Sequence, residues 1–218
     1  MSDALALKLI SQCSTLIFDF DGVILDSNHI KEEGFRHLFK SYGEDNTRKI
    51  VEYHRANGGL SRYHKIRYFF NTLLGKPVDD DTVERLANQF SEITMRLLTA
   101  PELRIEDTIQ FIKHMHLKKR MFIASASDEQ DLKILCRHHG IETKFDGIFG
   151  SPKTKEAIVS DIIKSRDSNE CVLIGDSLND INAAQHNDIA FVGYNNYSLS
   201  KTYPYINQFV EAFKLTLA

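Results

Sequence analysis

The chain has 218 residues, of which 42% are hydrophobic and 26% charged, with a formal net charge of -3. This composition is typical of a folded globular protein and excludes a disordered or fibrous chain. The charge balance favours neither a nucleic acid nor a membrane surface as partner, and no apolar run reaches the roughly 18 residues of a membrane span. The start of the chain does not have the pattern of a secretory signal. Three cysteines without CxxC spacing predict reduced thiols and a cytoplasmic protein.

The first predicted element is a buried strand. Residues 15–21 form a short apolar run that ends in acids, which is typical of a strand in a parallel sheet with a polar carboxyl end. A long helical pattern follows over residues 30–98, with breaks at Gly43, 57–59 and 75–77. No part of this second segment predicts a strand.

Strands and helices alternate in the rest of the chain. Strands are predicted at 120–125, 147–149, 171–175 and 190–193, and helices at 105–117, 129–138, 154–164, 178–186 and 208–215. Such alternation predicts a parallel sheet with helices on both faces. We therefore predict an α/β fold, a doubly wound parallel sheet of the Rossmann type formed by residues 1–26 and 96–218. The helical segment 27–95 is predicted to be an inserted cap domain.

Polar residues end several of the predicted strands. Asp19 and Asp21 end the first strand, Ser125 the second and Asp176 the fourth. In open α/β sheets, ligands bind beyond the carboxyl ends of the strands. We therefore expect these side chains to share one crevice, with the helical insertion above it.

Further charged residues join this group. Asp180 follows Asp176 by four residues, and Lys153 and Lys155 follow the third predicted strand. A cluster of acids without cations would repel itself, and a divalent cation relieves that repulsion. Oxygen-only ligands favour Mg2+, and Mg2+ beside a lysine suits a phosphoryl group.

Two carboxylates stand two residues apart in the string Asp19-Phe20-Asp21-Gly22. One carboxylate can attack phosphorus and form an aspartyl-phosphate. The other can protonate the leaving oxygen and later take a proton from water, provided that the two acids have different pKa values. Taken alone, the same string is also compatible with an ordinary Asx turn.

Four segments resemble, in order, the four motifs of the haloacid dehalogenase-like hydrolase superfamily. They are residues 19–27, 123–127, 150–155 and 174–180. The resemblance covers nearly the whole chain. The insertion after the first motif is similar to the small helical cap of the phosphoglycolate phosphatase and β-phosphoglucomutase branch.

The resemblance implies roles for the acids. Asp19 would be the nucleophile and Asp21 the general acid and base. Mg2+ would be held by the side chain of Asp19, the backbone carbonyl of Asp21 and the carboxylate of Asp176. Asp180 would act in the outer shell of the metal or as an alternate ligand.

The same resemblance implies a phosphate site. The hydroxyl of Ser125 and the backbone N–H of Ala126 would hold the phosphoryl oxygens. A lysine would neutralise both the nucleophile and the phosphate. We favour Lys155 because it opens a predicted helix, whose dipole also attracts an anion. Lys153 is the alternative, through a variant form of the third motif.

One string in the insertion is similar to the substrate loop of the mutases. Gly59-Leu60-Ser61-Arg62 matches their Gly-x-Ser-Arg pattern, in which the arginine engages the far end of the substrate. The planar guanidinium suits a phosphate or a carboxylate. Arg62 and Lys65 are therefore candidate specificity residues. A solvated loop arginine is the plain alternative.

These observations predict Mg2+-dependent hydrolysis of a small phosphorylated metabolite, such as a sugar phosphate, through an aspartyl-phosphate on Asp19. A small cap that closes over the crevice disfavours protein and nucleic-acid substrates, and we expect a monomer or a weak homodimer. Three alternatives stay open. A phosphomutase of the β-phosphoglucomutase type would use the same residues. A haloacid dehalogenase and a non-enzymatic phosphoaspartate switch are both disfavoured by Asp21.

Overall fold

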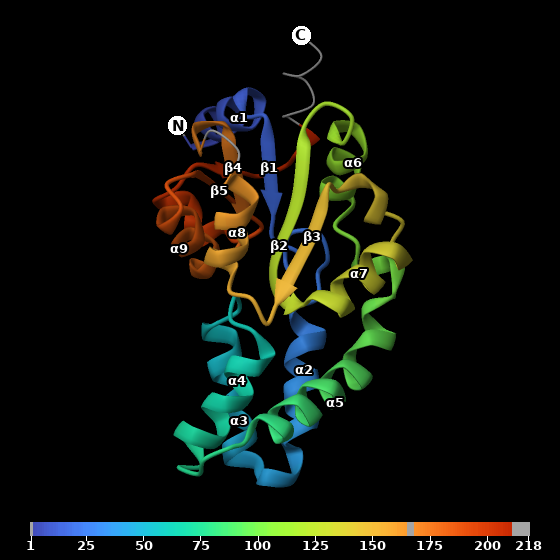
Figure 1. Cartoon of the computed structure of the whole chain (residues 1–218), viewed down its shortest axis with the longest axis vertical. Coiled ribbons are helices and arrows are strands. Elements are labelled where there is room, and N and C mark those ends of the chain that lie inside the picture. The colour runs from blue at the N-terminus through green and yellow to red at the C-terminus, as the bar shows by residue number, and fades with distance from the viewer. Residues whose placement is uncertain (1, 165–167, 211–218) are drawn as a thin grey trace.

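A parallel sheet lies at the centre of the molecule (Figure 1), in a computed structural model that describes residues 2–164 and 168–210. The sheet has six strands in the order β3-β2-β1-β4-β5-β6, and every neighbouring pair is parallel. The strands are β1 (Thr15–Phe18), β2 (Arg120–Asp128), β3 (Gly147–Ser151), β4 (Cys171–Gly175), β5 (Ala190–Tyr194) and β6 (Tyr205–Ile206). This order is that of a doubly wound α/β fold, so the predicted fold class is confirmed.

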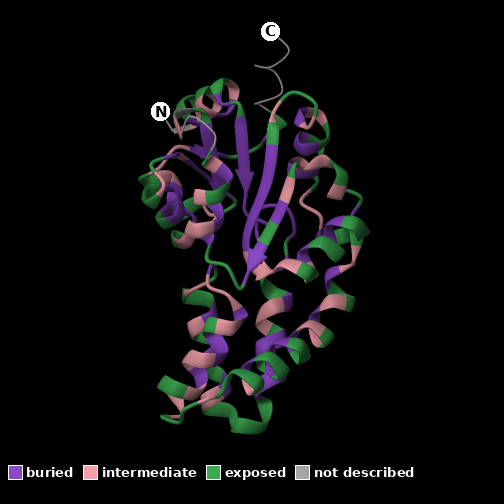
Figure 2. Ribbon diagram, viewed as in Figure 1, coloured by how far each residue is buried: buried purple, intermediate pink, exposed green. Residues whose placement is uncertain are grey.

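Helices cover both faces of the sheet. One face carries α1 (Ser2–Gln12), α6 (Glu106–Met115) and α7 (Glu129–His138), and the other carries α8 (Lys155–Ile163) and α9 (Leu178–His186). A hydrophobic core lies on each face of the sheet. Because successive side chains of a strand point to opposite faces, Leu16 and Phe18 pack in the first core and Ile17 in the second. All four residues of β1 are therefore buried, as are most strand residues in Figure 2.

The helical insertion lies beyond the carboxyl ends of the strands (Figure 1). Its helices are α2 (Asn28–Phe39), α3 (Glu44–Ala56), α4 (Arg62–Tyr68) and α5 (Asp80–Leu98). It has a hydrophobic cluster of its own, in which Phe39 stacks on Phe69 with ring centroids 3.9 Å apart. Helix α5 continues past residue 95, and its Leu98 packs in the hydrophobic core on the first face of the sheet. Helix α5 therefore connects the helical insertion to the α/β core.

Short helical turns connect the larger elements. They are η1 (Lys40–Tyr42), the π-helical turn η2 (Phe69–Leu73), η3 (Pro101–Leu103), η4 (Glu142–Lys144), η5 (Ser168–Glu170) and η6 (Tyr197–Lys201). None of the described helices is both long and apolar enough to cross a bilayer.

Side-chain caps fix where the helices that carry charged site residues begin. The hydroxyl of Ser61 accepts the backbone N–H of His64, so α4 starts at Arg62. The hydroxyl of Thr154 caps α8 in the same way, which makes Lys155 its first residue. Ser and Thr are favoured at this position because their side chains satisfy an orphan N–H.

Most predicted elements are confirmed, several of them to the residue, such as the strand 171–175 and the helices 129–138 and 178–186. The elements α1 and β6 were not predicted from the sequence. Of the α1 residues whose burial is described, only Ala6 and Ile10 are fully buried, and β6 has two residues, so neither leaves a clear periodic pattern. The predicted helix 208–215 lies largely outside the described residues.

We expect Phe18→Ala to lower the free energy of unfolding by about 3–5 kcal/mol, because it empties a site among three other aromatic rings. Phe18 has no exposed surface, and its ring lies 6.1–6.4 Å from those of Phe111, Phe145 and Phe209. Phe149→Ala is the matched control, since Phe149 is 37% exposed in the same sheet. Urea-induced unfolding measures both losses, and equal losses would contradict the assigned core.

Candidate active site

Three carboxylates gather where β1 and β4 end. The two strands are neighbours in the sheet, and the chain moves outward from them in opposite directions, which is where α/β sheets bind ligands. Asp19 follows β1, Asp176 follows β4, and Asp180 lies in the first turn of α9. One oxygen from each lies within 4.8 Å of the others. Three of the four predicted acids thus lie together, and Asp21 is not part of this group.

A buried lysine lies against this cluster. The ammonium of Lys155 is 3.0 Å from Oδ1 of Asp19 and 2.5 Å from Oδ1 of Asp180, and its side chain has no exposed surface. Lys153 takes a different direction. It precedes α8, forms an ion pair with Asp161 of that helix, and has a side chain that is 47% exposed. The structure therefore brings Lys155, and not Lys153, to the acids.

The charges of this group do not balance. Three carboxylates face one ammonium among the described residues. Burial and the nearby charge of Asp180 raise the pKa of Asp19 well above its ordinary value, and the same two causes raise the pKa of Asp176 to about 7. Because the donors are all oxygens and negative charge is in excess, the group fits a hard divalent cation such as Mg2+.

Asp180 is already engaged by the protein. One of its oxygens accepts from Lys155, and the other accepts the N–H and the hydroxyl of Ser177 at 3.0 and 2.6 Å. Asp176 accepts a hydrogen bond from the side chain of Asn28 and forms no ion pair within the described residues. Asp19 and Asp176 are therefore better placed than Asp180 to hold a cation directly.

Asp19 is held through one oxygen. Its Oδ1 accepts the backbone N–H of Phe20 at 2.7 Å and faces Lys155. The other oxygen, Oδ2, has no hydrogen bond or ion pair within the described residues. Asp19 also lines a crevice of ≈ 860 Å³, together with Asp21, Ser125, Ala126 and Asp176. One oxygen is thus fixed while the other stays available.

Asp21 has quite different surroundings. It forms an ion pair with Lys31 and accepts the hydroxyls of Ser27 and Ser127 at 2.5 and 2.6 Å. Burial alone would raise the pKa of Asp21, but Lys31 and these hydrogen bonds lower it below its ordinary value. The pKa values of the two acids of the first motif are therefore shifted in opposite directions, upward for Asp19 and downward for Asp21.

Ser125 and Ala126 line the crevice from within the last part of β2, a strand that extends to Asp128 and not only to the predicted residue 125. The hydroxyl oxygen of Ser125 accepts the N–H of Ser127 at 3.1 Å, which leaves its own proton to donate. Asp128, and not Ser125, caps the following helix, since Asp128 accepts from the N–H groups of Gln130 and Asp131. Ser125 thus keeps a donor for a ligand in the crevice.

Gly22 allows the ends of β1 and β4 to approach. Its φ of +75° is unfavourable for other residues, and a Cβ on it would lie 2.1 Å from Oδ2 of Asp176. The amide of Asn195 donates to the carbonyl of Gly22 at 2.9 Å, and that of Asn196 donates to the carbonyl of Asp176 at 2.7 Å. The loop after β5 therefore holds both acidic segments together.

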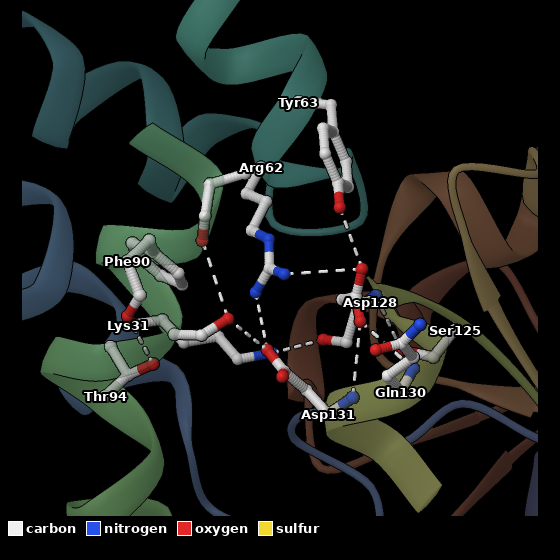
Figure 3. A network of polar contacts seen from close by, with 12 residues as sticks. Lys31, Arg62, Tyr63, Phe90, Thr94, Ser125, Asp128, Gln130 and Asp131 are labelled. Carbon is white, nitrogen blue, oxygen red and sulfur yellow. Dashed lines mark hydrogen bonds and ion pairs between the residues drawn. The ribbon is translucent and has the colours of Figure 1, made fainter. Parts of the chain in front are cut away.

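Arg62 is the centre of a polar cluster between the insertion and α7 (Figure 3). Its guanidinium lies 2.5 Å from Asp131 and 3.3 Å from Asp128. Tyr63 donates to Asp128 at 2.8 Å, and Ser91 donates to Asp131 at 2.7 Å. The side chain of Arg62 is only 8% exposed, so the alternative of a solvated loop arginine is wrong. We call these five residues the Arg62 cluster.

Lys65 is buried in the insertion. Its ammonium lies 2.9 Å from Nδ1 of His54 and 3.4 Å from the carbonyl of Gly58, and the residue is 2% exposed. Together with the insertion's Lys31, it reaches a cavity next to the acids.

Sequence reasoning missed Lys31, Ser127, Asp128 and Asp131. One signal was present: Lys31 stands near the start of a helix, where the dipole disfavours a cation. Asp128 and Asp131 occupy positions where acids are common at the start of any helix. The local sequence therefore does not indicate that they bind Arg62.

Comparisons with known proteins agree with this geometry. A family model of haloacid dehalogenase-like hydrolases matches residues 16–194, a span that contains all four motifs. The match confirms the family resemblance drawn from those motifs. No curated protein matches the sequence.

Solved structures share the fold over almost the whole chain. β-Phosphoglucomutase from Clostridium difficile is 19% identical and aligns over 94% of this chain and 99% of its own, with a TM-score of 0.74. A predicted phosphatase from Clostridium acetobutylicum is 16% identical over 95% and 99%, with a TM-score of 0.72. The HAD-hydrolase YfnB from Bacillus subtilis, solved with magnesium, is 19% identical over 95% and 100%, with a TM-score of 0.66. At these identities the likeness shows the fold alone.

The acidic cluster predicts a response to Mg2+. At 100 times its dissociation constant, a bound ion stabilises the folded state by about 2.7 kcal/mol, which raises the melting temperature of a chain this long by roughly 5–10 °C. Asp176→Asn should lose most of this rise. At pH 8, without metal, the variant should melt above wild type, because it removes one of the repelling charges.

The sign follows from the pKa of Asp176. Because this pKa is raised from 3.8 to about 7, ionisation costs stability as the pH rises through that window, and the full cost is present at pH 8. Asp161→Asn is the control, since Asp161 lies on the surface with Lys153 and Lys164. Thermal unfolding with and without Mg2+ measures the effect. An equal response of wild type and Asp176→Asn would contradict the assigned metal site.

Proposed function

Because the chain belongs to the haloacid dehalogenase-like hydrolases, we propose that it is a Mg2+-dependent phosphatase of a small phosphorylated metabolite. The single observation that carries this proposal is the buried contact of Lys155 with Asp19, beside Asp176 at the floor of the crevice. A carboxylate next to one ammonium and excess negative charge suits the binding of a phosphoryl group together with a divalent cation.

Asp19 acts as the nucleophile. Lys155 and the N–H of Phe20 fix its Oδ1, so Oδ2 is the oxygen that attacks phosphorus. A bond forms between Oδ2 and phosphorus as the bond from phosphorus to the leaving oxygen breaks, which gives an aspartyl-phosphate and an alkoxide. Lys155 balances the charge of the carboxylate before attack and of the phosphoryl group afterwards.

Mg2+ would be held by the carboxylates of Asp19 and Asp176 and, as the resemblance implies, by the backbone carbonyl of Asp21. It would supply the positive charge that keeps the two buried carboxylates ionised and offsets the charge on the phosphoryl oxygens. Asp180 supports the site from outside, because its oxygens already bind Lys155 and Ser177.

Asp21 moves the proton. Its lowered pKa and its ion pair with Lys31 keep it ionised, which is the state that takes a proton from the water that hydrolyses the aspartyl-phosphate. In the first step, the protonated form of Asp21 donates its proton to the leaving alkoxide. For that donation the contact with Lys31 must loosen, since Lys31 stabilises the ionised carboxylate.

The phosphoryl oxygens are held by the hydroxyl of Ser125, the N–H of Ala126 and the ammonium of Lys155. Ser125 and Ala126 line the same crevice as Asp19, and Ser125 retains a free proton to donate. Lys153 has no part in the site, because it pairs with Asp161 on the surface.

The helical insertion acts as a cap over this crevice. The amide of Asn179 donates to the carbonyl of Gly59 at 2.7 Å, and a Cβ on Gly59 would lie 2.3 Å from Cβ of Asn179. Together with the Arg62 cluster, this close contact holds the cap against the core. A closed cap excludes bulk water and restricts the substrate to a small metabolite, for which a sugar phosphate is our choice. The three cysteines are buried thiols, which fits a reducing, cytoplasmic setting.

Hydrolysis is preferred over phosphoryl transfer between two substrate positions. A phosphomutase would use the same acids and lysine, and the arginine of its cap loop would bind the far phosphate. Here Asp128 and Asp131 already neutralise Arg62. The dehalogenase alternative is disfavoured by Asp21, which has no task in an attack on carbon.

A screen of phosphorylated metabolites tests the proposal. Purified protein is incubated with sugar phosphates and other small monophosphates, with Mg2+ or with EDTA, and both free phosphate and isomerised products are measured. We expect phosphate release that stops in EDTA and returns with Mg2+. Isomer formation that needs a sugar bisphosphate and releases little phosphate would establish the mutase instead. Full activity in EDTA would show that the reaction does not need Mg2+.

A further inference from the structure

A second, smaller cavity adjoins the crevice. It has a volume of ≈ 50 Å³ and is lined by Asp21, Lys31, His54, Arg62 and Lys65, among others. Asp21 and His54 line the large crevice as well, so the two spaces meet at these residues. One water molecule needs about 10–15 Å³ of such space, so the cavity has room for a small polar group.

Two of the three cations in this cavity have carboxylate partners. Lys31 pairs with Asp21, and Arg62 pairs with Asp128 and Asp131. The third cation, the lysine of α4, has no carboxylate partner within the described part of the chain. All three acids that line the cavity are thus engaged by the other two cations.

The groups in direct contact with Lys65 are neutral, and the nearby charges of Lys31 and Asp21 belong to an ion pair with each other. The partners of Lys65 are Nδ1 of His54 and the carbonyl of Gly58, and the ring of Phe35 lies 5.8 Å from its ammonium. Burial and the charge of Lys65 lower the pKa of His54 to about 3, so the imidazole stays neutral and accepts through Nδ1. His54 therefore orients the ammonium without balancing its charge.

A buried ammonium without a counter-charge is costly. Burial and the nearby Lys31 lower the pKa of Lys65 to about 7, which expresses that cost. An apolar side chain of the same length would pack at this position without the cost of burying a charge. An anion in the adjoining cavity would supply the missing charge.

We propose that Lys65, oriented by His54, binds a second anionic group of the substrate, a carboxylate or a phosphate, remote from the phosphoryl group at Asp19. Arg62 then holds the cap against α7 and does not read the substrate. The inference rests on the proposed function, since it deepens the choice of substrate from any small phosphate ester to one with a second negative group.

Matched ligands and variants test the inference through binding. Asp19→Asn protein is used throughout, so that binding is measured without turnover. The ligand pairs are phosphoglycolate with 2-hydroxyethyl phosphate, which differ in one carboxylate, and fructose 1,6-bisphosphate with fructose 6-phosphate, which differ in one phosphate. Calorimetry gives each dissociation constant with Lys65 present, in Lys65→Met, and in the surface control Lys153→Met.

We expect the anionic member of at least one pair to bind about 10- to 100-fold more tightly than its neutral partner, and Lys65→Met to abolish that preference. The pair that shows the preference identifies the group as carboxylate or phosphate. Lys153→Met should leave it unchanged. Because Lys65→Met replaces a buried ammonium by an apolar chain, the variant should melt at or above the temperature of its parent.

No preference in either pair, or a preference that survives in Lys65→Met, would overturn the inference. Failure of the proposed function has a different signature. In that case wild-type protein releases no phosphate from any of these compounds, while the preference that depends on Lys65 persists in the binding data. If Lys65→Met does not fold, Lys65→Gln replaces it with the same expected loss.

Discussion

The contact of one buried ammonium with two buried carboxylates is the constraint on which the rest of the site depends. Lys155 lies between Asp19 and Asp180 and has no exposed surface. Removing one member of such a group would leave an uncompensated charge in the interior, so each member requires the others. The ammonium also determines which oxygen of Asp19 is fixed and which one is available for chemistry.

Several features of the fold place Lys155 and the surrounding carboxylates next to one another. β1 and β4 are neighbours, so the acids that follow them lie side by side, and Lys155, the first residue of α8, lies against Asp19 and Asp180. Gly22 lets the two acidic segments approach to a distance that a side chain would prevent. These features share one origin, which is that the carboxyl ends of parallel strands lie at the same edge of a sheet.

The parts of the site that lie at strand ends could be predicted from the sequence. Asp19, Ser125 and Asp176 each follow an apolar run that is long enough to be recognised as a strand, and strand order then places them together. Lys155 could be preferred over Lys153 because a helix begins there. In these cases the local pattern alone gave the position of the side chain.

Contacts between the insertion and the core could not be predicted in this way. Whether Arg62 meets a substrate or the carboxylates of Asp128 and Asp131 depends on how α4 packs against α7, and no local pattern records that packing. The same holds for Lys31, a residue of the insertion whose ion pair with Asp21 lowers the pKa of that carboxyl. Lys65 could be chosen as a candidate because it follows the string Gly59-Leu60-Ser61-Arg62 in the sequence. Its burial beside His54 depends on the fold and could not be predicted.

The central claim is that Asp19 carries the phosphoryl group during the reaction, and trapping this group tests it most directly. Asp21→Asn protein with Mg2+ is mixed with p-nitrophenyl phosphate, whose good leaving group needs no protonation, and the mixture is quenched in acid. Loss of the general base slows hydrolysis of the aspartyl-phosphate, typically by ~10²–10⁴-fold, so the phosphoenzyme should accumulate.

Peptide mass spectrometry then locates the added phosphoryl group. The account predicts one phosphoryl group on the peptide that contains Asp19, lost on treatment with hydroxylamine and absent from the Asp19→Asn, Asp21→Asn double variant. A phosphoryl group on another residue, or nitrophenol release with no phosphorylated peptide at any quench time, would contradict it.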